Sequence, residues 1–302
     1  MSATSTRILL NPTAGTALDK EVLEELIAAI LPGAELVVPP DAQDLERLAR
    51  EAVDDGCTTI VAAGGDGTVN GILNGLADRL SKVRLGILPL GTGNDFARTI
   101  NLPTDCEHSI AVLREGCTRR IDLIRVTTAS TSRLFLNVSA GGFSTKVSEF
   151  ATTVKEAWGP LCYARSFVGA LPELDDYQTR ITLDDSEEIT TPAYSVVVAN
   201  ARYVAGGLPI APEAELDDGL ADLLVLPVAT LRELATLAPA TMLGRHLDDD
   251  RVIFRRARKI VVESHPPMRF NADGELLPAE TATFEVLPTA LEVIVGPQPP
   301  QE

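Results

Sequence analysis

The first part of the chain alternates between short apolar runs and segments in which apolar residues recur at helical spacing. The runs predict buried strands at 8–10, 35–38, 59–63 and 85–88. Leucine and isoleucine recur every three or four positions from Leu23 to Ile30, and a similar pattern from Leu45 to Ala52 also predicts a helix. Strands that are apolar throughout and alternate with helices are typical of a parallel sheet covered on both faces. We therefore expect a three-layer α/β domain.

After about residue 126 the pattern changes to many short strand-like runs separated by turn residues. These runs lie at 134–138, 180–183, 194–199, 223–226, 260–263, 283–286 and 291–295, with helical stretches at 147–171 and 231–246. Such a series predicts an antiparallel sandwich or barrel. We expect two domains, of residues 1–126 and 127–289.

Charge and composition narrow the class of protein. The 302 residues include 26 lysines and arginines against 43 aspartates and glutamates, which gives a net charge of −17 and argues against general nucleic-acid binding. A hydrophobic content of 45% indicates a globular fold. No apolar stretch approaches the roughly 20 residues that a transmembrane helix needs, and the N-terminus does not resemble a signal peptide. Four scattered cysteines fit a reducing compartment, so we expect a cytoplasmic protein.

Glycine-rich segments follow three of the predicted strands, at the sheet edge where parallel sheets bind ligands. They are 11–15 (Asn-Pro-Thr-Ala-Gly), 64–70 (Gly-Gly-Asp-Gly-Thr-Val-Asn) and 89–96 (Pro-Leu-Gly-Thr-Gly-Asn-Asp-Phe). Glycines let backbone amides approach a phosphate, and a following helix adds a favourable field. Asp66 either engages Mg²⁺ directly or through water, or caps a helix. No Walker loop, dinucleotide fingerprint or protein-kinase motif set is present in the sequence.

Two acidic turns lie in the second half. Asp217 and Asp218 precede a glycine, with Asp222 beyond them, and form either an oxygen-ligand site for a hard cation or a plain hairpin turn. Asp273 and Glu275 flank Gly274, and either carboxylate could accept the proton of an alcohol during phosphoryl transfer, or the segment is only a turn.

Taken together, positions 64–68 and 89–96 resemble the diacylglycerol kinase catalytic-domain family. The nearest match is to its soluble bacterial lipid kinases of the DgkB and YegS type, relatives of sphingosine kinase. Further resemblances cover nearly the whole chain: 11–15 to the first nucleotide loop, 159–163 to a helical insertion, 211–220 to an acidic metal segment and 271–275 to a late catalytic motif. The resemblance implies an ATP-binding domain like those of NAD kinase and phosphofructokinase, a β-sandwich domain, and an active site between them. It also implies that a strand at about 290–297 returns to the first domain.

The resemblance carries residue roles. It implies nucleotide binding by Asn11, Pro12, Thr13, Ala14, Gly15, Gly64, Gly65, Asp66, Gly67, Thr68, Val69, Asn70, Thr92, Asn94 and Asp95. Asp218 would hold Mg²⁺ with main-chain oxygens near Glu215 and Leu220. Asp66 would take part in catalysis, and either Asp273 or Glu275 would be the base, with Asp273 slightly preferred. One departure concerns the family's nucleotide-contacting threonine after the second strand, because this chain has Pro39 and Pro40 there.

These observations predict an ATP- and Mg²⁺-dependent lipid kinase, with diacylglycerol as the first candidate for the acceptor. The alternatives are an NAD kinase, which shares the loop at 64–68, and a catalytically silent lipid- or nucleotide-binding module. The enzyme would contact the membrane peripherally, and a homodimer is left open. Because the overall acidity should repel an anionic surface, contact needs a local basic or apolar patch. The one dense basic cluster, 255–259, is either such a patch or a solvated strand edge.

Overall fold

The computed structural model describes residues 5–13, 20–142, 145, 176–227 and 231–297. The chain divides into two compact units, Met1–Leu123 with Pro288–Glu302, and Ile124–Leu287. The strands β5 (Thr118–Thr127) and β17 (Ala282–Ile294) each run from one unit into the other. Three features from the sequence lie outside the described residues, namely Ala14 with Gly15, the helical stretch at 147–171, and the segment 159–163 within it.

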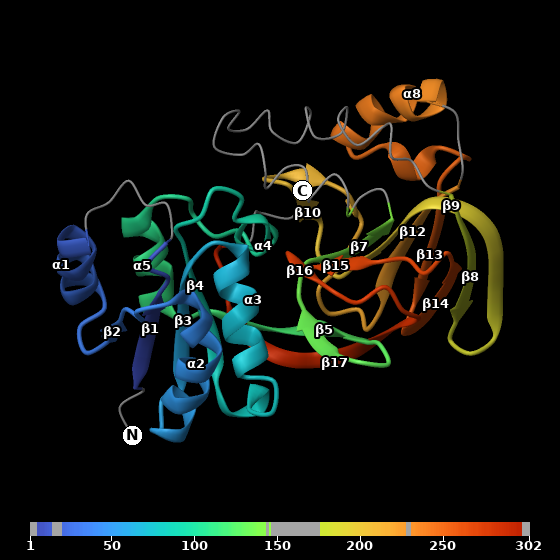
Figure 1. Ribbon diagram of the computed structural model, residues 1–302. Helices are drawn as coiled ribbons and strands as arrows, with labels where there is room; N and C mark the ends of the chain where they lie inside the picture. The colour runs from blue at the N-terminus through green and yellow to red at the C-terminus, as the bar shows by residue number, and fades with distance from the viewer. Residues whose placement is uncertain (1–4, 14–19, 143–144, 146–175, 228–230, 298–302) are drawn as a thin grey trace. The chain divides into compact units, whose positions relative to one another are not determined.

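The first unit is built on a parallel sheet with the strand order β17-β4-β3-β1-β2 (Figure 1). Its strands are β1 (Thr6–Leu10), β2 (Glu35–Val37), β3 (Thr59–Gly64), β4 (Arg84–Pro89) and the end of β17. Its helices are α1 (Lys20–Ile30), α2 (Leu45–Asp54), α3 (Asp66–Gly75), α4 (Asp95–Thr99) and α5 (Cys106–Glu115), with 3-10 turns η1 (Ala42–Asp44) and η2 (Leu80–Lys82). All six residues of β3 are buried, as the apolar run predicts for a strand covered on both faces. The α/β prediction is therefore confirmed.

Helix ends in this unit follow local sequence signals. Asp105 caps α5, because its carboxylate accepts the backbone N–H of His108 at 2.9 Å. The same helix ends at Gly116 in the left-handed region, with φ of 68°. The strand expected at 35–38 stops one residue early, at Val37, and Pro39 follows shortly after.

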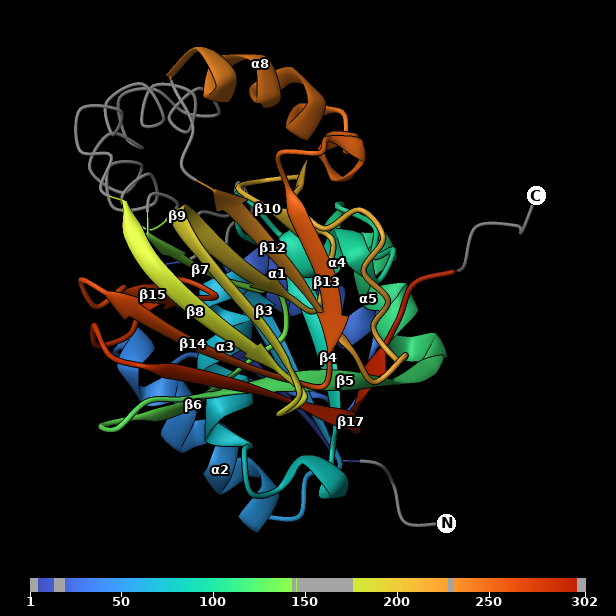
Figure 2. The same ribbon diagram turned by 90° about the vertical axis from the view of Figure 1, so that its right-hand side faces the viewer.

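The second unit is an antiparallel β structure, as the short runs predict. Figure 2 shows β14, β8, β9, β12 and β13 side by side, in the order of their pairing. Its strands are β6 (Ser132–Phe135), β7 (Val138–Gly142), β8 (Tyr177–Leu183), β9 (Glu187–Ala199), β10 (Tyr203–Val204), β11 (Leu208–Pro209), β12 (Ala221–Pro227), β13 (Ile253–Ala257), β14 (Lys259–His265), β15 (Phe270–Ala272) and β16 (Glu275–Leu276). Its helical elements are α8 (Leu231–Met242) and the 3-10 turn η5 (His246–Asp248). Within the described ranges, no helix is long and apolar enough to cross a membrane.

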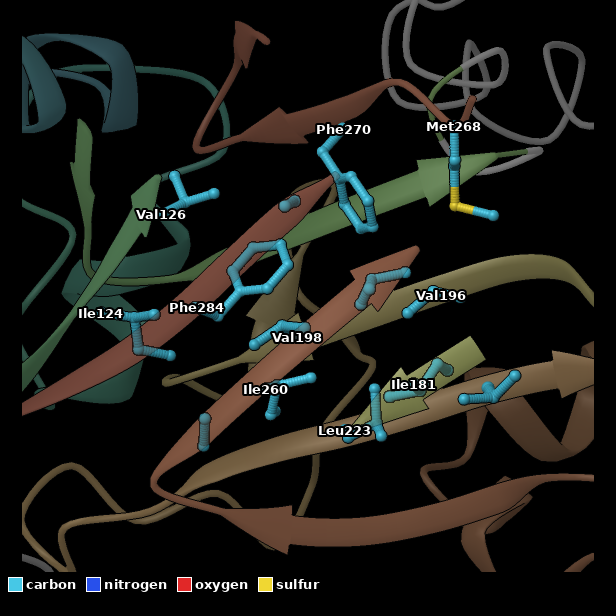
Figure 3. Packing of buried hydrophobic residues seen from close by; sticks show 14 of the residues in the cluster. Ile124, Val126, Ile181, Val196, Val198, Leu223, Ile260, Met268, Phe270 and Phe284 are labelled. Atoms are coloured by element: carbon cyan, nitrogen blue, oxygen red, sulfur yellow. The ribbon is translucent and has the colours of Figure 1, made fainter. Parts of the chain in front are cut away.

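The core of this unit is centred on three phenylalanines. Phe284 packs edge-on against Phe270, with ring centroids 5.2 Å apart, and against Phe135 at 6.2 Å. Figure 3 shows Phe270 and Phe284 together with Ile181, Val198 and other residues of the same core from neighbouring strands. The rings interlock edge to face, which is a favourable arrangement for aromatic side chains.

One predicted strand is wrong in its extent. The apolar run at 134–138 is not continuous, because β6 ends at Phe135 and β7 begins at Val138. Leu136 and Asn137 form a bend between the two strands. Their backbone amides leave the ladder and bind a distant carboxylate, as described below.

Candidate functional site

The three glycine-rich segments follow β1, β3 and β4, which are parallel neighbours in one sheet. Their loops therefore lie at the same edge of the first unit (Figure 1). The first loop is tied to the second by Asn11, whose side-chain amide donates to Thr68 Oγ1 at 2.8 Å. The Asn11 backbone N–H also donates to Ala63 O at 3.0 Å. The structure thus joins two segments that the sequence separates by more than fifty positions.

The second and third loops touch through glycine. A Cβ added at Gly91 would lie 2.4 Å from the Cα of Gly65, which is closer than atoms can pack. A Cβ at Gly64 would lie 2.2 Å from Thr68 Oγ1. The Leu90 N–H donates to Gly64 O at 3.0 Å and holds the loops together. Gly91 is therefore required for the contact between the second and third loops, whereas the missing side chain at Gly64 leaves room for Thr68 within the second loop.

The second loop opens helix α3, whose N-cap residue Gly65 has no capping side chain. Backbone amides at such a helix start favour a phosphate group. Several predicted nucleotide residues, including Pro12, Thr13, Gly67 and Thr92, are exposed around these loops. In contrast, Val69 and Asn70 are buried at 2% and 4% exposure, so their side chains support the helix and do not line its surface.

Asp66 spans the second and third loops. Its carboxylate accepts the backbone N–H groups of Asp95 and Phe96, each at 3.1 Å. Asp66 therefore caps α4, the helix of the neighbouring loop, and not the helix that it begins. The third loop is further fixed by Asn94 in the left-handed region, whose side-chain amide accepts from Gly91 N at 3.0 Å and donates to Gly91 O at 2.7 Å. Any chemical role of Asp66 is thus combined with a positioning role.

In the second unit, Asp273 and Gly274 form the two-residue turn between β15 and β16. Both residues have positive φ, 47° and 95°, as the favoured two-residue hairpin turns require. The hairpin pairs Ala272 with Glu275. The motif therefore does form a hairpin turn, which leaves a catalytic role open. Glu275 is exposed on the short strand β16.

The Asp273 carboxylate is directed at the Leu136–Val138 backbone. It accepts the N–H groups of Leu136 at 2.9 Å, Asn137 at 3.1 Å and Val138 at 3.0 Å. Three successive amides that converge on one carboxylate make a strongly anchored contact, because each hydrogen bond has a charged acceptor. This contact breaks the strand expected at 134–138.

The same bend is held from its carbonyl side by Asn200, which no sequence motif marks. Asn200 is 1% exposed and follows β9 directly. Its side-chain amide donates to Leu136 O at 3.0 Å, and its backbone N–H donates to Asn137 O at 2.8 Å. A polar residue at the end of the apolar run 194–199, and another that interrupts the run 134–138, are the signals that could have indicated this pairing.

The acidic segment near residue 218 forms an exposed turn. Asp218 accepts the Leu220 N–H at 2.9 Å, and Glu215 and Asp218 are both exposed. One carboxylate with nearby main-chain oxygens is a donor set that Mg²⁺ accepts, since this ion keeps several waters. Among the described residues, no three His, Cys, Asp or Glu side chains gather into a metal-binding group.

Unlike the exposed carboxylates of this turn, Asp222 is buried. It is 3% exposed and pairs with Arg256 at 2.9 Å. Burial raises the pKa of Asp222 to about 6, although the Arg256 guanidinium acts in the opposite direction. We therefore assign Asp222 to the ion pair and not to the exposed turn.

The basic cluster at 255–259 is largely neutralised in the structure. Arg255 pairs with Glu187 at 3.0 Å, and Lys259 pairs with Asp185 at 2.9 Å. Together with the Arg256–Asp222 pair, these contacts engage three of the four basic side chains of the cluster, while Arg258 is exposed. The solvated strand edge is the better description of this cluster.

Comparison with known proteins gives matches over both units. Residues 5–126 match the family model described as "Diacylglycerol kinase catalytic domain", and residues 137–295 match the "YegS C-terminal NAD kinase beta sandwich-like domain". A diacylglycerol kinase from Staphylococcus saprophyticus is 33% identical over 89% of this chain and 88% of its own. One from Staphylococcus aureus strain Newman is 31% identical over 92% of this chain and 89% of its own. A crystal structure of a diacylglycerol kinase from Bacillus anthracis, 20% identical over 97% of each chain, shares the fold with a TM-score of 0.75.

Proposed function

The chain belongs to the diacylglycerol kinase catalytic-domain family, and we propose that it transfers the γ-phosphate of ATP to the free hydroxyl of diacylglycerol. The observation that carries this proposal is the match of 5–126 to the diacylglycerol kinase catalytic domain, together with relatives named diacylglycerol kinase that match nearly the whole chain. It is a kinase that uses ATP and acts on a lipid alcohol, and an NAD kinase is not favoured. In the reaction, the lipid oxygen bonds to the γ-phosphorus, the bond from that phosphorus to the ADP oxygen breaks, and a base takes the hydroxyl proton.

We propose that the loops after β1, β3 and β4 bind the ATP phosphates. The N-terminus of α3, which has no capping side chain, and the exposed backbone around Gly67 support this role. Both offer N–H groups to an anion. Asp66 holds the third loop against the second, and Asn94 fixes the third loop internally through Gly91. Thr68 and Asn11 hold the first loop against the second.

For the catalytic base, the contacts support Glu275 over Asp273. Both oxygens of Asp273 already accept backbone N–H groups of the Leu136–Val138 bend, and these groups would compete with a substrate proton. Glu275 lies two positions further along, at the start of β16, and is exposed. A general base has to reach the proton that it accepts, which an exposed side chain can do.

We further propose that Asp218 holds Mg²⁺ with main-chain oxygens near Glu215 and Leu220. The exposed turn and its oxygen donors support this assignment. A bound cation would supply charge compensation that stabilises the acidic turn. Equilibrium dialysis with Mg²⁺ should give lower occupancy for Asp218→Ala than for Asp248→Ala, which removes an exposed carboxylate on η5.

Because the substrate is a lipid, we propose a cytoplasmic enzyme that contacts the membrane peripherally. Because most basic side chains of the cluster 255–259 are already paired with carboxylates, an apolar membrane contact is favoured over an electrostatic one. Met242 and Leu243, at the end of α8, are 71% and 70% exposed. Burying each such side chain in a bilayer would contribute about 1.5–3 kcal/mol.

Vesicle flotation tests this membrane contact. A variant with Met242→Ser and Leu243→Ser should float less with phosphatidylcholine vesicles than the wild type, whereas Val22→Ser, at an exposed apolar site of α1, should float equally. Binding that survives in the double variant and disappears at high salt would point to an electrostatic contact. Sedimentation velocity without vesicles shows whether the protein is a homodimer, which the sequence leaves open.

The activity itself is tested with radiolabelled ATP, Mg²⁺ and detergent micelles that contain diacylglycerol, sphingosine or undecaprenol, and with NAD in a parallel assay. We expect labelled phosphatidic acid and strong loss of labelling in Glu275→Gln. Label in another lipid would identify that lipid as the acceptor. Label in NAD alone would reject the lipid kinase. Absence of transfer to every acceptor would favour the silent binding module.

A further inference from the structure

Two consecutive peptide groups in the Leu136–Val138 bend are hydrogen-bonded at both ends. In the first, Leu136 O accepts the Asn200 side-chain amide at 3.0 Å, while the Asn137 N–H donates to Asp273 at 3.1 Å. In the second, Asn137 O accepts the Asn200 and Ala201 N–H groups at 2.8 and 3.1 Å, while the Val138 N–H donates to Asp273 at 3.0 Å. The orientation of each peptide plane is therefore fixed from two opposite sides.

This arrangement couples Asn200 to the hairpin that carries Glu275. A peptide plane is rigid, so the direction of its C=O sets the direction of its N–H. When Asn200 holds the two carbonyls, the amides point at Asp273 and anchor the turn. The Asp273 N–H completes the link by donating to Val138 O at 3.1 Å. Glu275 follows in the register Ala272 to Glu275, so a shift of the turn moves its carboxylate.

We propose that Asn200 is a positioning residue for the catalytic base, and that it acts through the Leu136–Val138 bend and Asp273. The inference rests on the proposed role of Glu275. Asn200 is 1% exposed and its amide is directed at a backbone carbonyl, so it has no direct contact with substrate in this role. Its removal leaves Leu136 O without this donor and frees the first peptide plane to rotate.

The test is a double-mutant cycle between Asn200→Ala and Glu275→Gln. Loss of a buried hydrogen bond that orients the base should lower kcat about tenfold in Asn200→Ala, with KM for ATP unchanged. In the Glu275→Gln background, Asn200→Ala should cause no further loss, because the group that it positions is already absent. An equal drop in both backgrounds would overturn the inference and indicate a general structural effect.

Thr179→Val is the matched control. Thr179 is 2% exposed and donates to Thr191 O at 2.6 Å, so this variant also deletes a buried side-chain donor to a backbone carbonyl. It should leave kcat unchanged. Hydrogen exchange gives a readout independent of activity, since the amides of Leu136, Asn137 and Val138 should exchange faster in Asn200→Ala and not in Thr179→Val.

The outcomes separate this inference from the proposed function. A folded Asn200→Ala protein with wild-type kcat and unchanged amide exchange overturns the positioning role alone. A fully active Glu275→Gln overturns the assignment of the base, and with it the catalytic part of the inference, whether or not the exchange rates change. If Asn200→Ala does not fold, Asn200→Leu keeps most of the side-chain volume and the backbone bonds but removes the amide donor, and the same cycle applies.

Discussion

The opposite contacts of Asp273 and Glu275 predict opposite consequences when each carboxylate is converted to its amide. Asp273→Asn should destabilise the second unit, whereas Glu275→Gln should leave stability unchanged and remove activity. Asp273 receives three backbone N–H groups, and Glu275 lies exposed two positions away. The two variants have the same change in formal charge, so each is the control for the other.

The magnitude follows from the hydrogen bonds of Asp273. Its two oxygens accept N–H groups at 2.9–3.2 Å, and an asparagine can offer only one of those oxygens. In either amide orientation at least one N–H loses its acceptor, and the others bind a neutral group. A hydrogen bond to a charged partner contributes about 1.5–3 kcal/mol, so with allowance for partial exposure we expect a loss of about 3 kcal/mol. Exposed substitutions such as Glu275→Gln change stability by no more than about 0.5 kcal/mol.

Urea unfolding monitored by circular dichroism, together with single-turnover phosphoryl transfer, measures both quantities. Asp273→Asn should unfold at lower urea and retain measurable chemistry at a temperature where it is folded. Glu275→Gln should unfold like the wild type and lose about 10²–10⁴-fold in rate. The reverse pattern, a stable but inactive Asp273→Asn beside an active Glu275→Gln, would refute the reasoning and make Asp273 the base.

Three further predictions concern other parts of the chain. Gly91→Ala should raise KM for ATP and lower the melting temperature, because its Cβ would lie 2.4 Å from the neighbouring loop, whereas Gly71→Ala, within α3 and with nothing within 4 Å of its Cβ, should do neither. Asp66→Ala should lower stability by about 1–2 kcal/mol in urea unfolding, since α4 loses its cap, and an unchanged midpoint would contradict the capping role. Burial raises the pKa of Asp222 to about 6 from 3.8, so the folded state binds this proton more tightly than the unfolded state. Its contribution to stability is present below pH 4 and is lost by about pH 6, and urea midpoints should therefore fall more steeply over this range in the wild type than in Asp222→Asn.

The sequence predicted the first unit well because its signals are local. Uninterrupted apolar runs identify strands that are buried on both faces, and the spacing from Leu23 to Ile30 identifies a helix by its own periodicity. The glycine-rich motifs were recognisable for the same reason, since their residue types and spacing lie within a few positions. The sequence could not show why position 91 has to be glycine, because the close contact that requires it is with Gly65 in another loop.

The second unit marks the limit of local signals. The run 134–138 has the composition of a strand, yet Asp273 captures its amides from more than a hundred positions away. Asn200 has no motif around it, and its role follows only from the carbonyls that it meets. The sequence also left the choice between Asp273 and Glu275 open, because both are carboxylates in one turn.

By itself, then, the sequence determined the α/β and β-rich halves, the glycine-rich loops at one edge of the sheet and the family resemblance. These properties depend on periodicity and on short motifs, which a linear chain carries in full. Only the tertiary structure decided which carboxylate is engaged by backbone amides, which glycines touch, and which basic residues are already paired. Those properties depend on hydrogen bonds and close contacts between distant segments, and their partners are fixed only when the chain has folded.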